Sequence, residues 1–363
     1  MTRLVQIQNG DERRVALVEE PHLRLLKRFR SLYEMVAASE VANRTLGSLG
    51  KSQALDSQRD EAVAPVNSAL TPDRSFLSLI KAHVSGDTLD YDAVYSGKSN
   101  WRLLSPIDHP TDAAHCLVSG TGLTHLGSAK NRAAMHEKSA AELTDSMRMF
   151  RWGLEGGRPA AGKVGNAPEW FYKGNASVLR APGEPLDVPP YAGDGGEEAE
   201  IAGVYFIDST GQPRRIGMTL GNEFSDHKFE KTNYLNLASS KIRTCSIGPE
   251  LVIDPAFDSV PGTASIERNG KTFWSKEIAT GESEMCHSLA NIEHHHFKFE
   301  THRRPGDLHV HYYGACALSF GEGIELLEGD VMSVQFQGFG RALRNPLRVS
   351  KNAHVPIVVQ PLP

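Results

Sequence analysis

The stretch Gly195-Gly196-Glu197-Glu198-Ala199-Glu200-Ile201-Ala202-Gly203-Val204-Tyr205-Phe206 places two glutamates at the start of an apolar strand. Side chains at positions i and i+2 of a strand point to the same face, so we expect Glu198 and Glu200 to share a face. Two neighbouring carboxylates repel each other unless a cation lies between them. A pair of this kind also occurs on solvated strand faces, so its context decides between a binding site and ordinary surface.

The context is a further carboxylate on the next strand-like segment. The run Ile216 to Leu220 leads into Gly221-Asn222-Glu223-Phe224-Ser225, where Glu223 follows directly on a turn. Three carboxylates with open coordination positions suit a hard divalent cation, which prefers oxygen ligands. The sequence therefore predicts that Glu198, Glu200 and Glu223 bind a metal ion, with Mg²⁺ as the first choice and Mn²⁺ or Ca²⁺ as alternatives.

From Trp101 onward the chain consists of short apolar runs separated by Gly, Pro, Asp and Asn. This pattern is typical of a β-rich architecture. We expect an α+β fold that is mostly β, with a rolled or barrel-like mixed sheet over residues 101–363 and a small α+β domain at residues 1–100. The predicted strands are Val178-Leu179, Ile201 to Ile207, Ile216 to Leu220, Leu251 to Ile253, Leu308 to Val310 and Val331 to Phe336.

The first hundred residues predict a hairpin followed by two helices. Residues 4–7 and 15–18 read as strands on either side of Asn9-Gly10, which favours a turn because both residues tolerate positive φ. Ser31 to Glu34 fits a capping box and predicts the start of a short helix. Apolar spacing over residues 77–84 predicts the second helix.

Composition excludes several classes of protein. The 363 residues are 40% apolar and 23% charged, with a net charge of −5, so the chain is globular and gives no general attraction to nucleic acid. No stretch approaches the roughly 18 apolar residues of a membrane span, and the chain contains neither GxGxxG nor a P-loop motif. The four cysteines lie far apart, which suits reduced thiols. We expect a cytoplasmic protein that does not bind nucleic acid or membranes.

Several motifs occur in the order and spacing of the fumarylacetoacetate hydrolase superfamily, which the chain resembles over about residues 101–350. The resemblance implies that family's fold, a metal site at Glu198, Glu200 and Glu223, and a small-molecule 2-keto acid as ligand. The motifs are Pro168 to Lys173, Glu198-Ala199-Glu200, Gly221 to Ser225, Lys241 ahead of Ile247 to Glu250, Pro305-Gly306-Asp307, and Glu328 to Val331 with Gly338 to Asn345.

The resemblance also implies that Lys173 and Lys241 line the same pocket as the metal. A solvated surface position is the commoner role for a lone lysine. In a partly dry pocket beside a dication, however, the pKa of a lysine falls because the charged form is disfavoured. Either lysine would then be equipped as a proton acceptor or donor near neutral pH.

The chain departs from the family pattern at the third metal ligand and after it. Glu223 stands where the family has Asp, and Ser225-Asp226-His227-Lys228 replaces a Ser-Ala-Arg-Asp run. His227 in the place of the Arg changes the usual contact with the substrate carboxylate. We expect His227, Ser225 and Lys241 to contact the substrate.

Hydrolytic members resembling this chain carry His and Glu three residues apart on an N-terminal lid, where the pair activates water. The matching region here, Gly120 to Ser128, has His125 with Ser three places later, so this pair is missing. His136-Glu137 could substitute only if a helix from about Lys130 bends in, because neighbours at i and i+1 face different ways. His125 and His136 are therefore the candidate proton donors.

A histidine-rich insert replaces the family's late Thr-Gly-Thr-Pro loop. It contains Glu293-His294-His295-His296-Phe297 and His309-Val310-His311. A zinc site is an alternative, but consecutive histidines cannot all face one point, and hydrogen bonding to neighbouring backbone is the preferred interpretation. His309 and His311 alternate on one strand face, and we expect them in the pocket or at a dimer interface.

The insert resembles the branch of the superfamily that contains 2-keto-3-deoxypentonate dehydratases. The resemblance implies loss of water from a 2-keto-3-deoxy sugar acid, such as the xylonate or arabinonate form, to give 2,5-dioxopentanoate. A metal-polarised 2-keto group would make a C3 proton acidic enough for Lys173 or Lys241 to remove. The rivals are a hydrolase that cleaves the carbon-carbon bond of an acylpyruvate or 2,4-diketo acid, and a non-catalytic 2-keto-acid binding protein. By analogy the protein is a homodimer.

Overall fold

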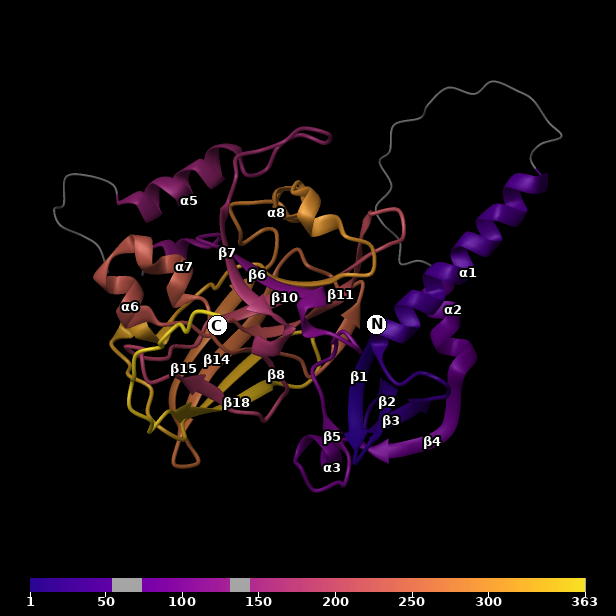
Figure 1. Cartoon of the computed structure of the whole chain (residues 1–363), viewed down its shortest axis with the longest axis horizontal. Coiled ribbons are helices and arrows are strands. Elements are labelled where there is room, and N and C mark those ends of the chain that lie inside the picture. Colours follow the sequence, from indigo (N-terminus) through magenta and orange to yellow (C-terminus); the bar gives the residue numbers. More distant parts are fainter. Residues whose placement is uncertain (54–73, 131–143, 363) are drawn as a thin grey trace.

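The computed structural model describes residues 1–53, 74–130 and 144–362 and has a mixed fold in which strand outweighs helix (Figure 1). Two sheets form the body of the molecule, with helices at its ends and sides. The predicted fold class is therefore confirmed. Within the described ranges, no helix is long and apolar enough to cross a membrane.

The larger sheet has thirteen strands. They are β1 (Thr2–Asn9), β2 (Glu12–Glu19), β3 (His22–Leu26), β4 (Val84–Asp90), β5 (Arg102–Leu103), β6 (Cys116–Gly122), β7 (Glu169–Asn175), β8 (Leu179–Arg180), β10 (Ala199–Ile207), β11 (Pro213–Asn222), β12 (Cys245–Ile247), β13 (Leu251–Ile253) and β16 (Leu308–Tyr312). The main order is β4-β3-β2-β1-β13-β11-β10-β16-β6-β7, with β5 beside β1 and β12 joining β11 to β8. The β16–β6 and β12–β8 pairs are parallel, so the sheet is mixed.

The smaller sheet packs against one face of the larger one. Its strands run in the order β15 (Lys271–Thr280), β14 (Val260–Arg268), β17 (Val331–Phe336), β18 (Leu343–Val349) and β9 (Leu186–Val188). Ile201 and Leu220 of the larger sheet share an apolar core with Ile266 and Phe336 of the smaller sheet. The opposite face of β10 packs its even-numbered apolar side chains into a second core that includes residues of the first helices. All nine residues of β10 are therefore buried, and any polar side chain on this strand lies in the interior.

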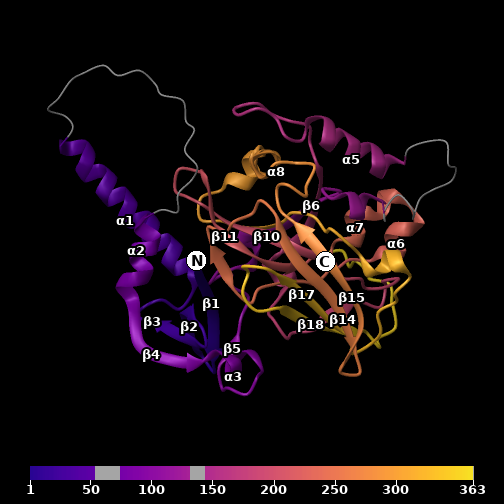
Figure 2. The same ribbon diagram turned by 180° about the vertical axis from the view of Figure 1, so that it is seen from behind.

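The helices lie around the sheets (Figures 1 and 2). The first two project beside the N-terminal strands, and α6 and α7 lie on the opposite side of the molecule. The α-helices are α1 (Leu32–Gln53), α2 (Arg74–His83), α3 (Tyr91–Tyr95), α5 (Asp145–Gly156), α6 (His227–Thr232), α7 (Leu237–Ser240) and α8 (Leu289–Phe297). Short 3-10 helices are η2 (Ala113–His115), η3 (Ala176–Val178), η4 (Tyr234–Asn236), η5 (Glu300–Arg303) and η6 (Ser319–Glu322).

The N-terminal hairpin and both helices are confirmed, with two differences. Ser31 Oγ accepts the backbone N–H of Glu34 at 3.2 Å, as the capping box requires, but α1 runs through Gln53 and is not short. Val84 begins β4 instead of ending α2. Because β1 pairs with β13, the N-terminal strands extend the larger sheet, and the domain boundary near residue 100 stays a prediction.

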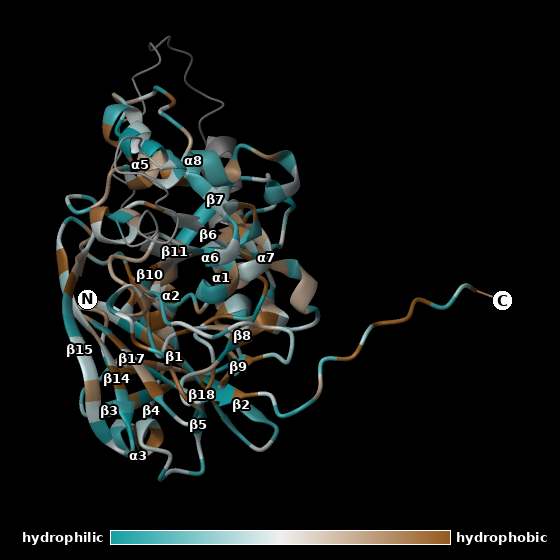
Figure 3. Ribbon diagram, turned by 90° about the vertical axis from the view of Figure 1, so that its left-hand side faces the viewer, coloured by the Kyte–Doolittle hydropathy of each residue, from teal (hydrophilic) through white to brown (hydrophobic). Residues whose placement is uncertain are grey.

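The segment after β18 leaves the body of the molecule. Residues 351–362 have no regular helix or strand, are exposed, and reach away from both sheets (Figure 3). Its apolar side chains include Ile357, Val359 and Leu362, each more than 85% exposed. The sheets are therefore complete without this segment.

Candidate active site

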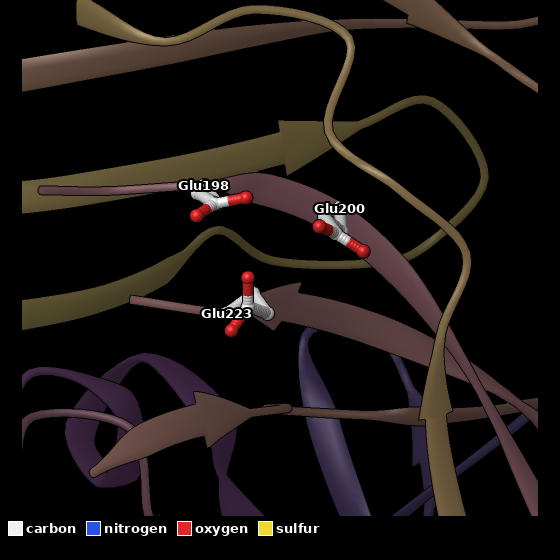
Figure 4. A group of neighbouring side chains, drawn as sticks. All are labelled: Glu198, Glu200 and Glu223. Atoms are coloured by element: carbon white, nitrogen blue, oxygen red, sulfur yellow. The ribbon is translucent and has the colours of Figure 1, made fainter. Parts of the chain in front are cut away.

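The three predicted carboxylates lie together where β10 begins and β11 ends (Figure 4). Glu198 directly precedes β10, Glu200 is the second residue of β10, and Glu223 directly follows β11. One carboxylate oxygen from each lies within 4.8 Å of the others, and all three side chains are buried. Glu198 and Glu200 share a face of their strand, as their i, i+2 spacing predicts.

Antiparallel pairing brings Glu223 to the two earlier glutamates. Glu200 pairs with Gly221, and the backbone N–H of Glu223 donates to the carbonyl of Glu198 at 3.0 Å. Gly221 is required here because a Cβ at this position would lie 2.5 Å from the ring of Tyr312. The close packing of β11 on Tyr312 therefore fixes where Glu223 emerges.

Two buried lysines reach these carboxylates from distant segments. Lys173 on β7 places its Nζ 2.6 Å from Glu223 Oε1 and donates to the backbone carbonyls of Glu223 and Phe224 at 2.5 and 2.7 Å. Lys241, which follows α7, donates to Glu223 Oε2 at 2.5 Å, to Ser225 Oγ at 2.9 Å and to Glu198 Oε1. Neither lysine is exposed. The structure thus brings both predicted lysines into one site with the carboxylates.

The three carboxylates differ in their electrostatic surroundings. Burial would raise the pKa of Glu198, but Lys241 and the hydrogen bond from His227 hold it well below its usual value. Burial and the charges of Glu223 and Glu198 raise the pKa of Glu200 well above its usual value. The pKa of Glu223 is also raised, by burial and by Glu198, against the opposing effect of Lys173. Glu200 is therefore the carboxylate whose negative charge is least compensated by nearby cationic side chains.

These residues fit a hard divalent cation. All three side chains are carboxylates, which such ions prefer as ligands, and the raised pKa of Glu200 reflects anionic charge that a cation would neutralise. Lys241 Nζ already bridges Glu198 and Glu223. An ion held by all three glutamates requires this ammonium to withdraw or to lose its proton. In the described part of the chain, no other group of His, Cys, Asp and Glu side chains meets the same distance criterion.

Ser225 and His227 also lie at this site. Ser225 Oγ is 3.2 Å from both carboxylate oxygens of Glu223. His227 Nε2 donates to Glu198 Oε1 at 3.1 Å; burial would lower the pKa of His227, but the bond to Glu198 and its charge raise it. A cavity of about 280 Å³ is lined in part by Gly196, Lys228 and Phe320, and Gly196 and Phe320 lie next to the ring of His227.

His125 does not contact the carboxylates or the lysines. Thr124 Oγ1 donates to the carbonyl of Tyr313, so His125 Nδ1 must donate to Thr124 Oγ1 at 2.9 Å, which leaves Nε2 to accept from Thr280 at 3.1 Å. Burial lowers the pKa of His125 to about 4. This neutral ring is hydrogen-bonded at both nitrogens and is therefore poorly placed to donate a proton. His136 lies outside the described residues.

His309 and His311 lie on the opposite face of the sheet from the carboxylates. Their neighbours Leu308, Val310 and Tyr312 point into the core that β10 shares with the first helices. On the other face, Nδ1 of His309 lies 2.9 Å from Nε2 of His296 on α8. His311 is held by Ser119 at 2.8 Å and Thr121 at 2.7 Å. Because alternation on β16 turns both side chains away from the carboxylates, the expectation that they line the pocket is wrong, and the alternative of a dimer interface stays a prediction.

Sequence reasoning assigned no role to two buried glutamates near the site. Glu197 accepts the backbone N–H and the hydroxyl of Ser319 at 2.8 and 2.7 Å, which explains its burial next to Glu198. Glu169, which is 7% exposed, accepts the hydroxyl of Tyr234 at 3.0 Å. Glu169, Phe171 and Lys173 occupy alternate positions of β7, so their side chains share one face of the sheet. This i, i+2, i+4 spacing is the sequence feature from which the position of Glu169 could have been predicted.

Comparison with known proteins shows the fold. No protein-family model and no curated protein sequence matches the chain. Among solved structures, it has the fold of fumarylacetoacetate hydrolase-like enzymes, a class that includes dehydratases and isomerases.

Three of these structures illustrate the likeness. A 2-keto-3-deoxyarabinonate dehydratase matches with a TM-score of 0.64 and 16% identity, over 96% of this chain and 100% of the other. A 2-keto-3-deoxy-D-arabinonate dehydratase complexed with magnesium and 2,5-dioxopentanoate matches with a TM-score of 0.63, 16% identity and the same coverage. A 2-hydroxyhepta-2,4-diene-1,7-dioate isomerase from Mycobacterium marinum matches with a TM-score of 0.53 and 18% identity, over 97% and 100% of the two chains.

Proposed function

We propose that the chain is a Mg²⁺-dependent hydro-lyase that removes water from a 2-keto-3-deoxy sugar acid, such as a 2-keto-3-deoxypentonate, to give 2,5-dioxopentanoate. The observation that carries the proposal is the buried group of Glu198, Glu200 and Glu223 with two buried lysines. The likeness in fold to a dehydratase complexed with magnesium and 2,5-dioxopentanoate supports it.

Each residue has a distinct role in this proposal. Glu198, Glu200 and Glu223 hold Mg²⁺, which when bound polarises the 2-keto group and acidifies the C3 protons. Lys241 is assigned as the base that removes a C3 proton, because its Nζ lies between Glu198 and Glu223. Lys173 orients Glu223, since its ammonium is anchored by that carboxylate and two backbone carbonyls. His227 and Ser225 complete the polar wall beside the substrate.

An assay with and without metal tests the proposal. The purified protein is offered a small panel of 2-keto-3-deoxypentonates and 2,4-diketo acids, with mass spectrometry of the products. We expect a product lighter by one water from a pentonate, loss of turnover in EDTA and recovery with Mg²⁺; Mn²⁺ and Ca²⁺ serve as comparison ions. Release of pyruvate from a diketo acid would instead identify a carbon-carbon hydrolase, and binding of Mg²⁺ and a keto acid without turnover would identify a binding protein.

We also propose that the enzyme acts as a cytoplasmic homodimer. Exposed apolar side chains on the α6–α7 region, Leu235, Ile242 and Phe229, support an interface there. All four cysteines are free thiols, which fits a reducing compartment. Sedimentation equilibrium over a range of concentrations measures the assembly, and a monomer at high micromolar concentration contradicts the dimer.

A further inference from the structure

We propose that the C-terminal arm, residues 351–362, packs on the α6–α7 surface of a second copy of the chain, so that two copies exchange their arms. The α6–α7 surface is the exposed apolar patch formed by Phe229, Leu235 and Ile242. This inference rests on the proposed homodimer and deepens it, because it names the segment that joins the two copies.

The C-terminal arm carries apolar side chains that its own chain leaves in solvent. Lys351 is its one residue among Lys, Arg, Asp and Glu. Segments that remain unbound in water are instead rich in charged and polar residues, which need no burial. The composition of the arm therefore points to a partner surface. Five apolar side chains of the arm are between 63% and 95% exposed: Val355, Ile357, Val358, Val359 and Leu362.

Proline keeps the arm extended before it meets a partner. Pro356 and Pro361 fix their own φ angles and favour an extended backbone at the residues before them. A stiff, extended segment loses less conformational entropy on binding than a flexible one. The prolines also lack an N–H group, so the arm is better suited to docking through its side chains than to joining a sheet as an inner strand.

The arm is long enough to cross the surface of a second molecule. It follows β18 and extends away from both sheets of its own chain (Figure 3). At about 3.3 Å per residue, its extended length is at most roughly 40 Å. Near its start, the ring of His354 lies 6.1 Å from the ring of Tyr191, but residues 355–362 are all exposed. Most of the arm is therefore available to another chain.

The start of the arm lies close to the α6–α7 surface. The backbone N–H of Ser350 donates to the carbonyl of Val188 at 2.9 Å, which ties the end of β18 to β9. The loop after β9 in turn contacts α6, since the backbone N–H of Gly193 donates to Asp226 Oδ2 at 2.9 Å. Asp226 is the N-cap of α6 and accepts the backbone N–H of Phe229. The arm and the α6–α7 surface therefore begin at neighbouring positions on the body.

This arrangement favours a second copy of the chain as the partner. Homodimers are usually two-fold symmetric, so the same surface of both copies meets at the axis. When two α6–α7 surfaces face each other, each arm starts at the contact and, because it leads away from its own body, runs across the other copy. A stable interface buries about 800 Å² on each partner, which three partly exposed side chains alone do not supply. The apolar side chains of the arm extend the contact.

The surface that receives the arm belongs to the helix that carries His227. The ring of His227 is buried beside Glu198, whereas Phe229, two residues later, is 40% exposed. Lys228 and Lys231 of the same helix line the cavity next to the site. A helix of six residues is not stable by itself, so a partner arm on its outer side helps to hold it in place. Assembly of the dimer then supports the site of each copy.

Sedimentation equilibrium of the full-length chain and of a chain that ends at Ser350 tests the inference. We expect the dissociation constant of the dimer to increase at least about tenfold in the shortened chain, because the apolar contacts of the arm are lost. The melting temperatures of the two chains, measured at a concentration where both are monomeric, should agree. This agreement shows that the shortened chain is folded.

A substitution on the receiving surface shows where the arm binds. Leu235→Ala should raise the dissociation constant of the full-length dimer about three- to tenfold. In the shortened chain the same substitution should have an effect below about two-fold, because residues in contact have non-additive effects and the arm is already absent. Leu154→Ala on α5, where the leucine is 65% exposed, is the matched control and should leave both dissociation constants unchanged.

The outcomes separate the exchange of arms from the homodimer on which it rests. Equal dissociation constants for the full-length and shortened dimers would overturn the exchange of arms while the homodimer stands. If Leu235→Ala weakens both dimers by the same factor, the arm binds elsewhere and the inference is also overturned. A full-length chain that stays monomeric at high micromolar concentration contradicts the homodimer, and the exchange of arms fails with it.

Discussion

Glu200 is the carboxylate of the site that a metal ion would affect most. Its neighbours Glu198 and Glu223 each contact a lysine, whereas Glu200 accepts the backbone N–H of Gly314. Burial and the two adjacent carboxylates raise its pKa, so its ionised form opposes folding when no ion is bound. Removing its charge should therefore stabilise the metal-free protein and destabilise the metal-bound protein.

We predict that Glu200→Gln keeps or raises the melting temperature of the metal-free protein and abolishes its increase on adding Mg²⁺. An amide is a weaker ligand for Mg²⁺ but repels Glu198 and Glu223 less. For the wild-type protein, Mg²⁺ at about 100 times its dissociation constant should stabilise the fold by about 2.7 kcal/mol. Calorimetry with a Mg²⁺ titration measures both effects, and full turnover by the variant at micromolar Mg²⁺ would contradict the ligand assignment.

At the scale of elements, the site depends on how closely β11 packs on the side chain of Tyr312, which reaches it across β10 from β16. Tyr312 of β16 lies under Gly221, and its hydroxyl donates to the carbonyl of Ser246 on β12 at 2.9 Å. The ring is fully buried and cannot move toward solvent. Any side chain at Gly221 must therefore displace β11, which carries Glu223 at its end.

We predict that Gly221→Ala lowers the free energy of unfolding by about 1–3 kcal/mol, the usual cost of overpacking a core. It should also weaken Mg²⁺ binding, because Glu223 moves with β11. Gly86→Ala on β4 is the matched control: a Cβ there meets nothing within 4 Å, so we expect a change below about 0.5 kcal/mol. Urea unfolding measures both variants, and equal stabilities would show that β11 adapts to the added methyl group.

The contact between α8 and β16 contains a cluster of buried histidines, His296, His309 and His311 with His302 of η5. Burial, with smaller effects of neighbouring histidines, lowers the pKa of His309 and of His311 to about 3. Folding therefore favours the neutral rings. The unfolded chain, whose histidines titrate near pH 6.5, binds more protons below that pH.

We predict that the stability contributed by these neutral histidines is fully retained above about pH 6.5 and falls as the pH decreases toward 3. At pH 5, one histidine with these two pKa values lowers the free energy of unfolding by about 2 kcal/mol. Urea unfolding at pH 7.5 and pH 5 measures the effect. His309→Gln should reduce the pH dependence, whereas substitution of the exposed His22 by Gln should leave it unchanged. The same pH dependence in the wild-type protein and in His309→Gln would contradict the buried, neutral cluster.

At the scale of the whole molecule, stability resides in the two packed sheets. The cores on either face of β10 contain residues from the N-terminal strands through β18, so they join distant parts of the chain. The segment 351–362, by contrast, is exposed along its length (Figure 3). Its apolar side chains therefore contribute little to the fold of one chain.

We predict that deleting residues 351–363 changes the melting temperature by less than about 2 °C when measured at a concentration where the protein is monomeric. For a protein of this size, a shift of about 2–4 °C corresponds to about 1 kcal/mol. Differential scanning calorimetry of the full-length and shortened chains makes the comparison. A decrease of several degrees under these conditions would show that the segment packs on its own chain.

The sequence alone predicted the class of fold and the three glutamates that lie together. Apolar runs between turn residues predict the strands, and the spacing of Glu198 and Glu200 places them on one face because successive side chains of a strand alternate. Glu223 follows the adjoining strand, so antiparallel pairing brings it to them. These features follow from local periodicity, which a single sequence shows.

Only the tertiary structure decided which distant side chains complete the site. The placement of β7 and α7 brings Lys173 and Lys241 to Glu223. A hydrogen bond with Thr280 holds His125 away from the carboxylates, and the backbone of β6 packs against Glu169. The parallel pairing of β16 with β6 joins segments that no local pattern connects, and it brings Ser119 and Thr121 against His311. Pairing and register between distant strands depend on packing of the whole core, and for this reason the local sequence does not encode them.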